Sequence, residues 1–129
     1  MKTTIQLIFC LLLLAVYSFT ANTEEKNPCM IMHEGKFKYK SGTGTAIVTI
    51  KGDEHMEYHN KGKYYIKSKI KWVSDCEYET TLIEATLPDF PFKPGESLFV
   101  TLTKVKGKKI YYTSNINGTK FNGMFTKVK

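Results

Sequence analysis

The sequence predicts an all-β protein, a single eight-stranded antiparallel up-and-down barrel, with a β-sandwich of the same strands as the alternative. Polar and apolar residues alternate with a period of two over successive short segments, as half-buried strands require. Short turn-forming sequences separate most of these segments, and no helical period interrupts them. A meander of eight strands that closes on itself leaves no strand edge exposed, which favours the barrel.

Residues 1–21 have the pattern of a secretory signal peptide that is removed from the mature chain. Lys2 precedes an apolar run from Ile5 to Val16, and small or polar residues follow. A transmembrane anchor needs about 20 apolar residues, and this run is shorter. We therefore expect a secreted or periplasmic protein without a transmembrane anchor in its mature part, which would be one domain over residues 22–129.

Two cysteines, Cys29 and Cys76, remain once the signal peptide is removed. An even pair in an exported protein most simply forms one disulfide, and two unpaired buried thiols are the alternative. A bridge would tie the N-terminal segment to the end of the central hairpin. On the chain-entropy model it would stabilise the fold by about 4 kcal/mol.

The stretch from Tyr64 to Glu84 shows the alternation most clearly and predicts a hairpin. If Val73 to Asp75 form a three-residue loop, Trp72 lies opposite Cys76 on the inner face. The other inner pairs in this register are Ile70 with Tyr78, Ser68 with Thr80 and Ile66 with Leu82. A two-residue loop at Ser74 and Asp75 would set core residues against charged ones, because a slip of one residue inverts every side chain. The three-residue loop is therefore preferred.

The other strands follow from the same alternation. They are predicted at residues 35–40, 45–51, 54–59, 97–105, 110–116 and 119–128. The pair Asn117-Gly118 predicts a type I′ turn, which requires positive φ at both positions. This turn sets Tyr112 opposite Gly123, Ser114 opposite Phe121 and Ile110 opposite Phe125. The segment from Leu87 to Glu96 contains three prolines and is predicted to be the one long loop.

The sequence HMEYH contains His55, Glu57 and His59, which as strand residues share one face about 6.5 Å apart. They lack the i, i+4 arrangement of a helical zinc motif. Because Met56 and Tyr58 are the apolar residues of this strand, we expect those two to face inward and the polar three to face solvent. Neither a metal site, a cofactor nor a catalytic set is predicted, so we expect a protein that is not an enzyme.

The 19 basic residues are all lysines, and with 12 acidic residues they give a net charge of +7. The lysines recur at every second position of the predicted strands, where a solvated face needs charge. Bidentate contacts with phosphate and guanine are made by arginine, which the chain lacks. No nucleic-acid partner is therefore expected.

The early Cys29, the segment GKFKY and the hairpin KWVSDCEYETTL together resemble a family of small exported proteins of Bacteroidota bacteria with a lipocalin-like appearance. The specific part of the resemblance is the set Trp72, Ser74, Asp75, Cys76 and Tyr78. The resemblance implies a lipocalin-like barrel and an exported protein, and it brings no catalytic residues.

A barrel of this size either is filled by its own side chains or holds one small ligand. Because small residues interrupt the aromatic inner faces, we expect a small apolar or amphipathic ligand, entering near Leu87 to Glu96. The predicted ligand-binding residues are Tyr58, Tyr64, Ser68, Trp72, Tyr78, Thr80, Tyr112, Ser114 and Gly123. The alternative is a non-catalytic module that binds a cell-envelope protein through its lysine-rich faces, Phe90 and Phe92, and needs no cavity.

Overall fold

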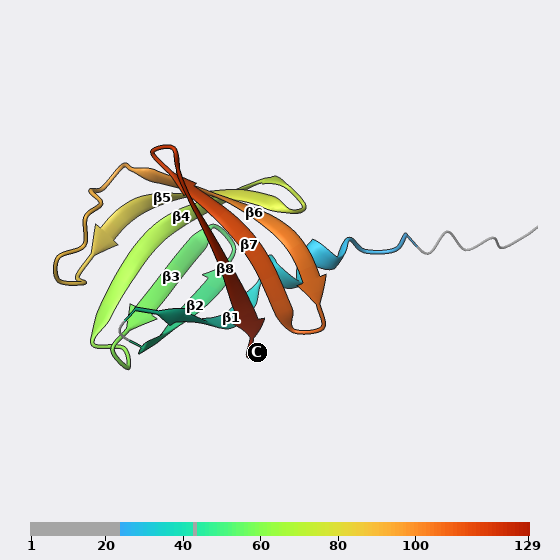
Figure 1. The fold of residues 1–129 in the computed structure, drawn as a ribbon, viewed down its shortest axis with the longest axis horizontal. Coiled ribbons are helices and arrows are strands. Elements are labelled where there is room, and N and C mark those ends of the chain that lie inside the picture. The colour runs from blue at the N-terminus through green and yellow to red at the C-terminus, as the bar shows by residue number, and fades with distance from the viewer. Residues whose placement is uncertain (1–23, 43) are drawn as a thin grey trace, which may run out of the picture.

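The computed structural model describes residues 24–42 and 44–129, so the predicted signal peptide lies outside the described residues. Eight strands form one closed antiparallel barrel in which each strand pairs with the next (Figure 1). The strands are β1 (Gly35–Ser41), β2 (Gly44–Lys51), β3 (Glu54–His59), β4 (Tyr64–Ser74), β5 (Glu77–Ala85), β6 (Ser97–Lys106), β7 (Lys109–Ile116) and β8 (Thr119–Lys127). The predicted barrel is confirmed, and the alternative sandwich is not formed. In the described part of the chain, no helix is long and apolar enough to span a membrane.

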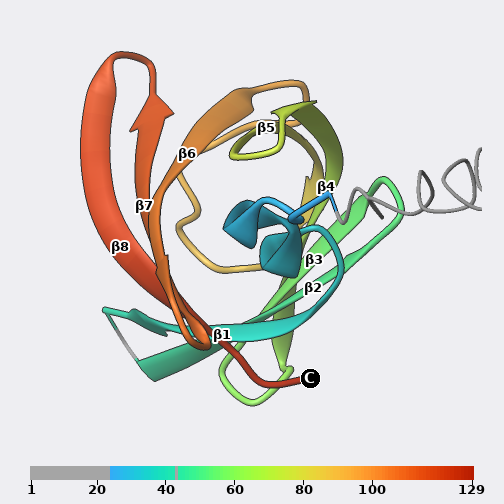
Figure 2. The same ribbon diagram turned by 90° about the vertical axis from the view of Figure 1, so that its right-hand side faces the viewer.

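One end of the barrel is covered by a short 3-10 helix, η2 (Pro28–Met32), which the sequence analysis did not predict. Figure 2 shows this helix lying across the ring of strands. Asn27 caps it by accepting a hydrogen bond from the Cys29 amide at 3.0 Å. Met32 is completely buried, because it points into the barrel core. The helix therefore plugs this end.

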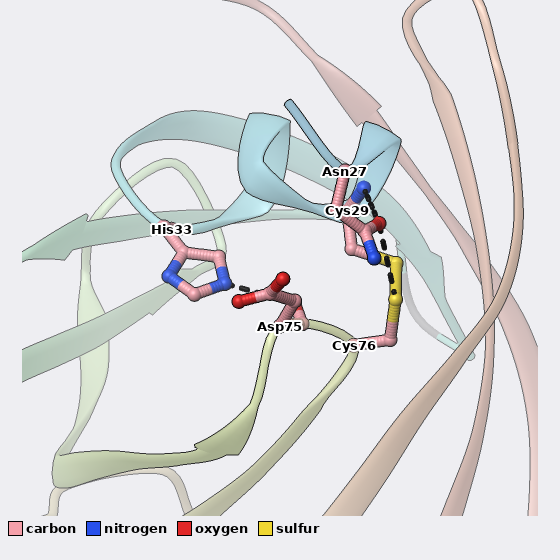
Figure 3. The surroundings of a disulfide bond; sticks show 5 residues. All are labelled: Asn27, Cys29, His33, Asp75 and Cys76. Carbon is pink, nitrogen blue, oxygen red and sulfur yellow. Dashed lines mark hydrogen bonds between the residues drawn. A yellow bond between two sulfur atoms is a disulfide. The ribbon is translucent and has the colours of Figure 1, made fainter. Parts of the chain in front are cut away.

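The predicted disulfide between Cys29 and Cys76 is present and holds the plug in place (Figure 3). It joins η2 to the turn between β4 and β5. A second contact supports it, since the His33 ring donates from Nε2 to the backbone carbonyl of Asp75 at 2.9 Å. On the other side of the helix, the Lys127 ammonium donates to the carbonyls of Ile31 and Glu34, each at 3.0 Å. The plug is thus held from two sides.

The barrel closes through a short ladder between β1 and β8. Only Phe37 with Lys127 and Lys38 with Thr126 are paired in its register among the described residues. The carbonyl of Lys129 extends the closure by accepting from the Lys36 amide at 2.8 Å. Gly35 allows this approach, because it has φ 134° and an added Cβ would lie 2.6 Å from the Lys129 carbonyl oxygen.

The hairpin of β4 and β5 has the predicted faces but not the predicted register. Trp72 lies opposite Tyr78 rather than Cys76, and Ile70 lies opposite Thr80, a shift of two residues. The turn itself consists of Asp75 and Cys76, and a bulge at Val73 absorbs the odd residue. The predicted three-residue loop is therefore wrong, whereas the inner face is right because a shift of two residues preserves it.

The hairpin of β7 and β8 has the predicted register. Asn117 and Gly118 have φ of 51° and 84°, as the type I′ turn requires. The predicted pairs Tyr112 with Gly123, Ser114 with Phe121 and Ile110 with Phe125 are all formed. Phe121, however, is half exposed rather than part of the interior.

The apolar core fills only the plugged half of the barrel. Its residues pack below η2 and come from all strands except β3. They are Cys29, Met32, Phe37, Val48, Ile50, Ile70, Tyr78, Val100, Leu102, Ile110 and Phe125. The buried residues outside this cluster are Ala46, Ile66 and Leu82 with the polar His55, His59, Ser68, Thr80 and Ser114. The opposite half is therefore built differently from the core.

Candidate functional site

Strand β3 turns its polar residues into the barrel, which is the reverse of the prediction. His55 and His59 are buried, with 7% and 6% of their surface exposed, and Glu57 lies between them on the same face. Met56 and Tyr58 face outward. The cause is the register of the two-residue turn at Gly52-Asp53, which sets His55 opposite buried Ile50 and Glu57 opposite buried Val48. The predicted solvated face of His55, Glu57 and His59 and the inward Tyr58 are therefore wrong.

His55 and Glu57 border a cavity of about 200 Å³ in the half of the barrel away from η2. The wall combines apolar side chains with hydroxyl, imidazole and carboxyl groups. The lining residues are Tyr39, His55, Glu57, Ile66, Ser68, Thr80, Leu82, Phe90, Phe92, Glu96, Ser97, Leu98 and Ile116. The barrel is thus filled at one end and hollow at the other.

The proline-rich segment between β5 and β6 forms the rim of the cavity. In Figure 1 it lies at the end of the barrel opposite η2. Two backbone hydrogen bonds fix it to β5, from the Leu82 amide to the Glu96 carbonyl and from the Gly95 amide to the Leu82 carbonyl, both at 2.9 Å. Phe90 and Phe92 pack edge to face with ring centroids 5.3 Å apart and line the cavity. The rim is therefore ordered and aromatic.

Glu57 is the centre of a hydrogen-bonded cluster at the cavity wall. Its Oε1 accepts from His59 Nε2 at 2.5 Å and from the Tyr39 hydroxyl. Both hydrogen bonds go to this one oxygen, so Oε2 has no partner among the described residues. On the same wall, His55 Nδ1 is buried without a hydrogen-bond partner. The cavity therefore offers two unused polar atoms.

Burial and hydrogen bonding set the charges of this cluster. Burial lowers the pKa of His55, so the ring is neutral at neutral pH. Burial alone would raise the pKa of Glu57, but the hydrogen bonds from His59 and Tyr39 outweigh it and hold that pKa below its usual range. Burial, with the Glu57 carboxylate nearby, raises the pKa of Tyr39. The cavity wall thus carries the ionised Glu57, the neutral imidazole of His55 and the neutral phenol of Tyr39.

The structure distributes the predicted ligand-binding residues over both halves of the barrel. Ser68 and Thr80 line the cavity. Trp72 and Tyr78 belong to the plugged end, where the Trp72 ring stacks on His33 with centroids 3.5 Å apart and meets Tyr78 at 4.8 Å. Tyr64 faces inward opposite His59, and Ser114 is buried opposite Val100, and neither lines the cavity.

Tyr112 and Gly123 do not leave room in the barrel, as the sequence analysis expected. The Tyr112 ring lies over Gly123, and a Cβ added to the glycine would overlap with it. The same ring stacks on Phe125 with centroids 4.4 Å apart. The space that glycine leaves is therefore filled by its cross-strand partner. Both residues instead border an open depression between β1 and β8.

None of the protein-family models, curated proteins or solved structures compared with the chain matches it.

The cavity has the chemistry of a binding site. Within residues 24–42 and 44–129, no group of three or more His, Cys, Asp and Glu side chains is arranged to hold a metal ion. Because His55 Nδ1 has no hydrogen-bond partner, it activates neither the Ser68 nor the Thr80 hydroxyl through that atom. What the wall supplies is an apolar surface with a few polar groups at fixed positions, which is typical of small-molecule sites.

Four lining residues that bear on binding were not predicted as ligand-binding residues from the sequence. They are Tyr39, His55, Glu57 and the rim residue Phe92. His55 and Glu57 could have been predicted to face inward, because the two-residue turn at Gly52-Asp53 places them opposite the inward-facing Ile50 and Val48 of β2.

Proposed function

We propose that this barrel binds a small amphipathic molecule in the cavity beneath the proline-rich rim, and that it does so without catalysis. The observation that carries the proposal is the cavity itself, which has a mixed lining and two polar atoms without partners, Glu57 Oε2 and His55 Nδ1. A buried polar atom without a partner costs about 1–3 kcal/mol. That cost applies to His55 Nδ1, and a ligand that donates to Glu57 Oε2 adds a hydrogen bond that the described residues do not supply.

The size of the cavity limits the ligand. Pockets for drug-sized ligands span about 300–1,000 Å³, and this one is about 200 Å³. A ring-sized molecule with one polar group fits this space better than a long fatty chain. The predicted signal peptide and the disulfide are consistent with a protein that meets its ligand outside the cytoplasm.

The alternative, an envelope-protein interface built on Phe90 and Phe92, has less support. Both rings are partly buried, contact each other and line the cavity. They are therefore less available to a protein partner than the sequence suggested.

Native mass spectrometry of the protein purified from its host tests the proposal, together with saturation-transfer NMR using 2-phenylethanol as a neutral amphipathic probe. We expect retained mass or saturation transfer for the wild-type protein. The double substitution Ser68→Leu, Thr80→Leu fills the wall and should abolish both while the barrel persists by circular dichroism, because a cavity accepts added methylenes. Thr101→Leu on an exposed strand position is the matched control.

Two results would contradict the proposal. One is the absence of both retained mass and saturation transfer in the wild-type protein. The other is undiminished binding in the double variant.

A further inference from the structure

The charges on the cavity wall are opposite in sign to those of the whole chain. The chain has 19 basic residues, all lysines, and a net charge of +7. Among the described residues, those that line the cavity nevertheless include two carboxylates, Glu57 and Glu96, and no lysine. We propose that the ligand is a small primary amine with an apolar body the size of one ring, bound with its ammonium group at Glu57. This inference rests on the proposed function and adds the chemical class of the ligand.

Glu57 has one oxygen free for such a group. His59 and Tyr39 occupy Oε1, and His59 is not among the residues that line the cavity. Oε2 is therefore left as an acceptor on a carboxylate that lines the cavity. Hydrogen bonds between charged partners are about twice as strong as neutral ones, so an ammonium donor gains more here than an alcohol. The Glu57 carboxyl keeps its charge in the barrel because its pKa lies below the usual range.

His55 supplies a second acceptor on the same wall. Its Nδ1 is buried and has no partner, and its side chain is opposite Ser68 in the register of β3 and β4. In the tautomer with the proton on Nε2, Nδ1 accepts a hydrogen bond. An ammonium group carries three N–H donors, so it can donate to Oε2 and still has donors left for neighbouring acceptors. A carboxylate ligand has no donor for either atom.

The same wall disfavours anionic ligands such as fatty acids. A ligand carboxylate would lie near Glu57 with no lysine in the described lining to balance it. Burying like charges together is unfavourable, and an unpaired charge in a site of low dielectric costs several kcal/mol. The lysines instead occupy outward positions, for example Lys69 and Lys71 on β4, which are exposed. They impose no attraction inside the cavity.

The rim provides a place for the apolar body of the amine. Phe90 and Phe92 present two rings in edge-to-face contact, and Tyr39 borders the cavity beside Glu57. Aromatic faces attract both apolar rings and cations within about 6 Å. Glu96 adds a second negative charge at the rim, where its Oε2 accepts from the Lys93 amide at 2.7 Å. The rim therefore adds an aromatic surface and a second carboxylate to the lining of the cavity.

Isothermal titration calorimetry at pH 7 with three probes of matched shape tests the inference. The probes are 2-phenylethylamine, 2-phenylethanol and phenylacetate. We expect the amine to bind at least ~10-fold more tightly than the alcohol, and phenylacetate to bind weakest. Glu57→Gln should reduce the affinity for the amine by ~10-fold or more and leave that for the alcohol within about twofold. Glu54→Gln, on the exposed start of the same strand, is the control and should change neither.

The outcomes separate the ligand class from the proposed function. If phenylacetate or the alcohol binds as tightly as the amine, or if Glu57→Gln leaves the amine affinity unchanged, the amine assignment is overturned while ligand binding stands. If none of the probes binds but the native protein retains a mass, the amine assignment also fails and the proposed function survives. The order of the three probes on the wild-type protein decides the matter even if Glu57→Gln does not fold.

Discussion

Removal of the disulfide should destabilise the barrel by about 4 kcal/mol. Cys29 and Cys76 are separated by 47 positions in the sequence. In the chain-entropy model the entropy lost by the unfolded chain is about 2.1 plus 1.5R ln n cal/mol/K, which gives about 4 kcal/mol at 25 °C for a loop of this length. The double substitution Cys29→Ala, Cys76→Ala should therefore lower the free energy of unfolding by about 4 kcal/mol in urea.

The packing of η2 into the barrel end gives a second test of the role of the disulfide. Met32 is completely buried, so Met32→Ala should cost about 2–5 kcal/mol in the native protein. Met30 lies on the same helix and is 40% exposed, and Met30→Ala should cost under about 0.5 kcal/mol. If the disulfide acts partly by keeping η2 in the barrel end, Met32→Ala should cost less in the disulfide-free variant, because the two changes act on the same docking step.

Two results would refute this reasoning. A loss of less than about 1 kcal/mol in the disulfide-free variant would contradict the entropic estimate. Strict additivity of that variant with Met32→Ala would show that the bridge does not hold the plug.

Three further predictions follow from burial and packing. Burial lowers the pKa of His55, so the unfolded chain binds this proton before the folded chain does as the pH falls below about 6.5. The free energy of unfolding should therefore decrease as the pH falls through this range. Thermal melts should show a smaller decrease for His55→Gln than for the wild-type protein. Gly123→Ala should cost about 1–3 kcal/mol in urea, because the new methyl overlaps with the Tyr112 ring; a neutral result would mean that the ring moves freely. Trp72→Ala should cost about 3–5 kcal/mol and the exposed Lys69→Ala under about 1 kcal/mol, and similar losses for the two would contradict the assigned inner face.

The strands and the barrel were predictable because their signals are local. Alternation with a period of two identifies a strand wherever one face is buried, and the Asn117-Gly118 turn fixed the register of β7 and β8 because both positions require positive φ. The disulfide pairing was predictable by counting, since the predicted mature chain has only Cys29 and Cys76.

The register of the central hairpin was not predictable from alternation alone. The bulge at Val73 adds one residue to β4, and the turn moves to Asp75 and Cys76. A shift of two residues keeps every side chain on its face, so the inner pattern fits both registers equally well. Only the packing between strands, and the attachment of Cys76 to η2, distinguishes them.

The inward face of β3 was mispredicted because hydrophobicity was used as the only guide. Met56 and Tyr58 are more apolar than His55 and Glu57, but the tight turn after β2 fixes which residues of β3 face inward. The plug η2 was missed for another reason, since five residues of 3-10 helix have no periodic signal. Polar residues on the inner face of a strand are expected mainly at functional sites. The cavity lies beside such residues, on the inner face of β3.

The central claim is that the half of the barrel under the proline-rich rim is hollow and takes a ligand. Titration of the ¹⁵N-labelled protein with 2-phenylethylamine, followed through its amide chemical shifts, tests this most directly. We predict that the largest shifts fall on cavity residues such as Ser68, Thr80 and Leu98, and that Val100 and Ile110 in the filled half stay unchanged. Shifts spread over the exposed lysine-bearing faces or centred on the filled half would contradict it, whereas the absence of any shift would overturn only the amine assignment.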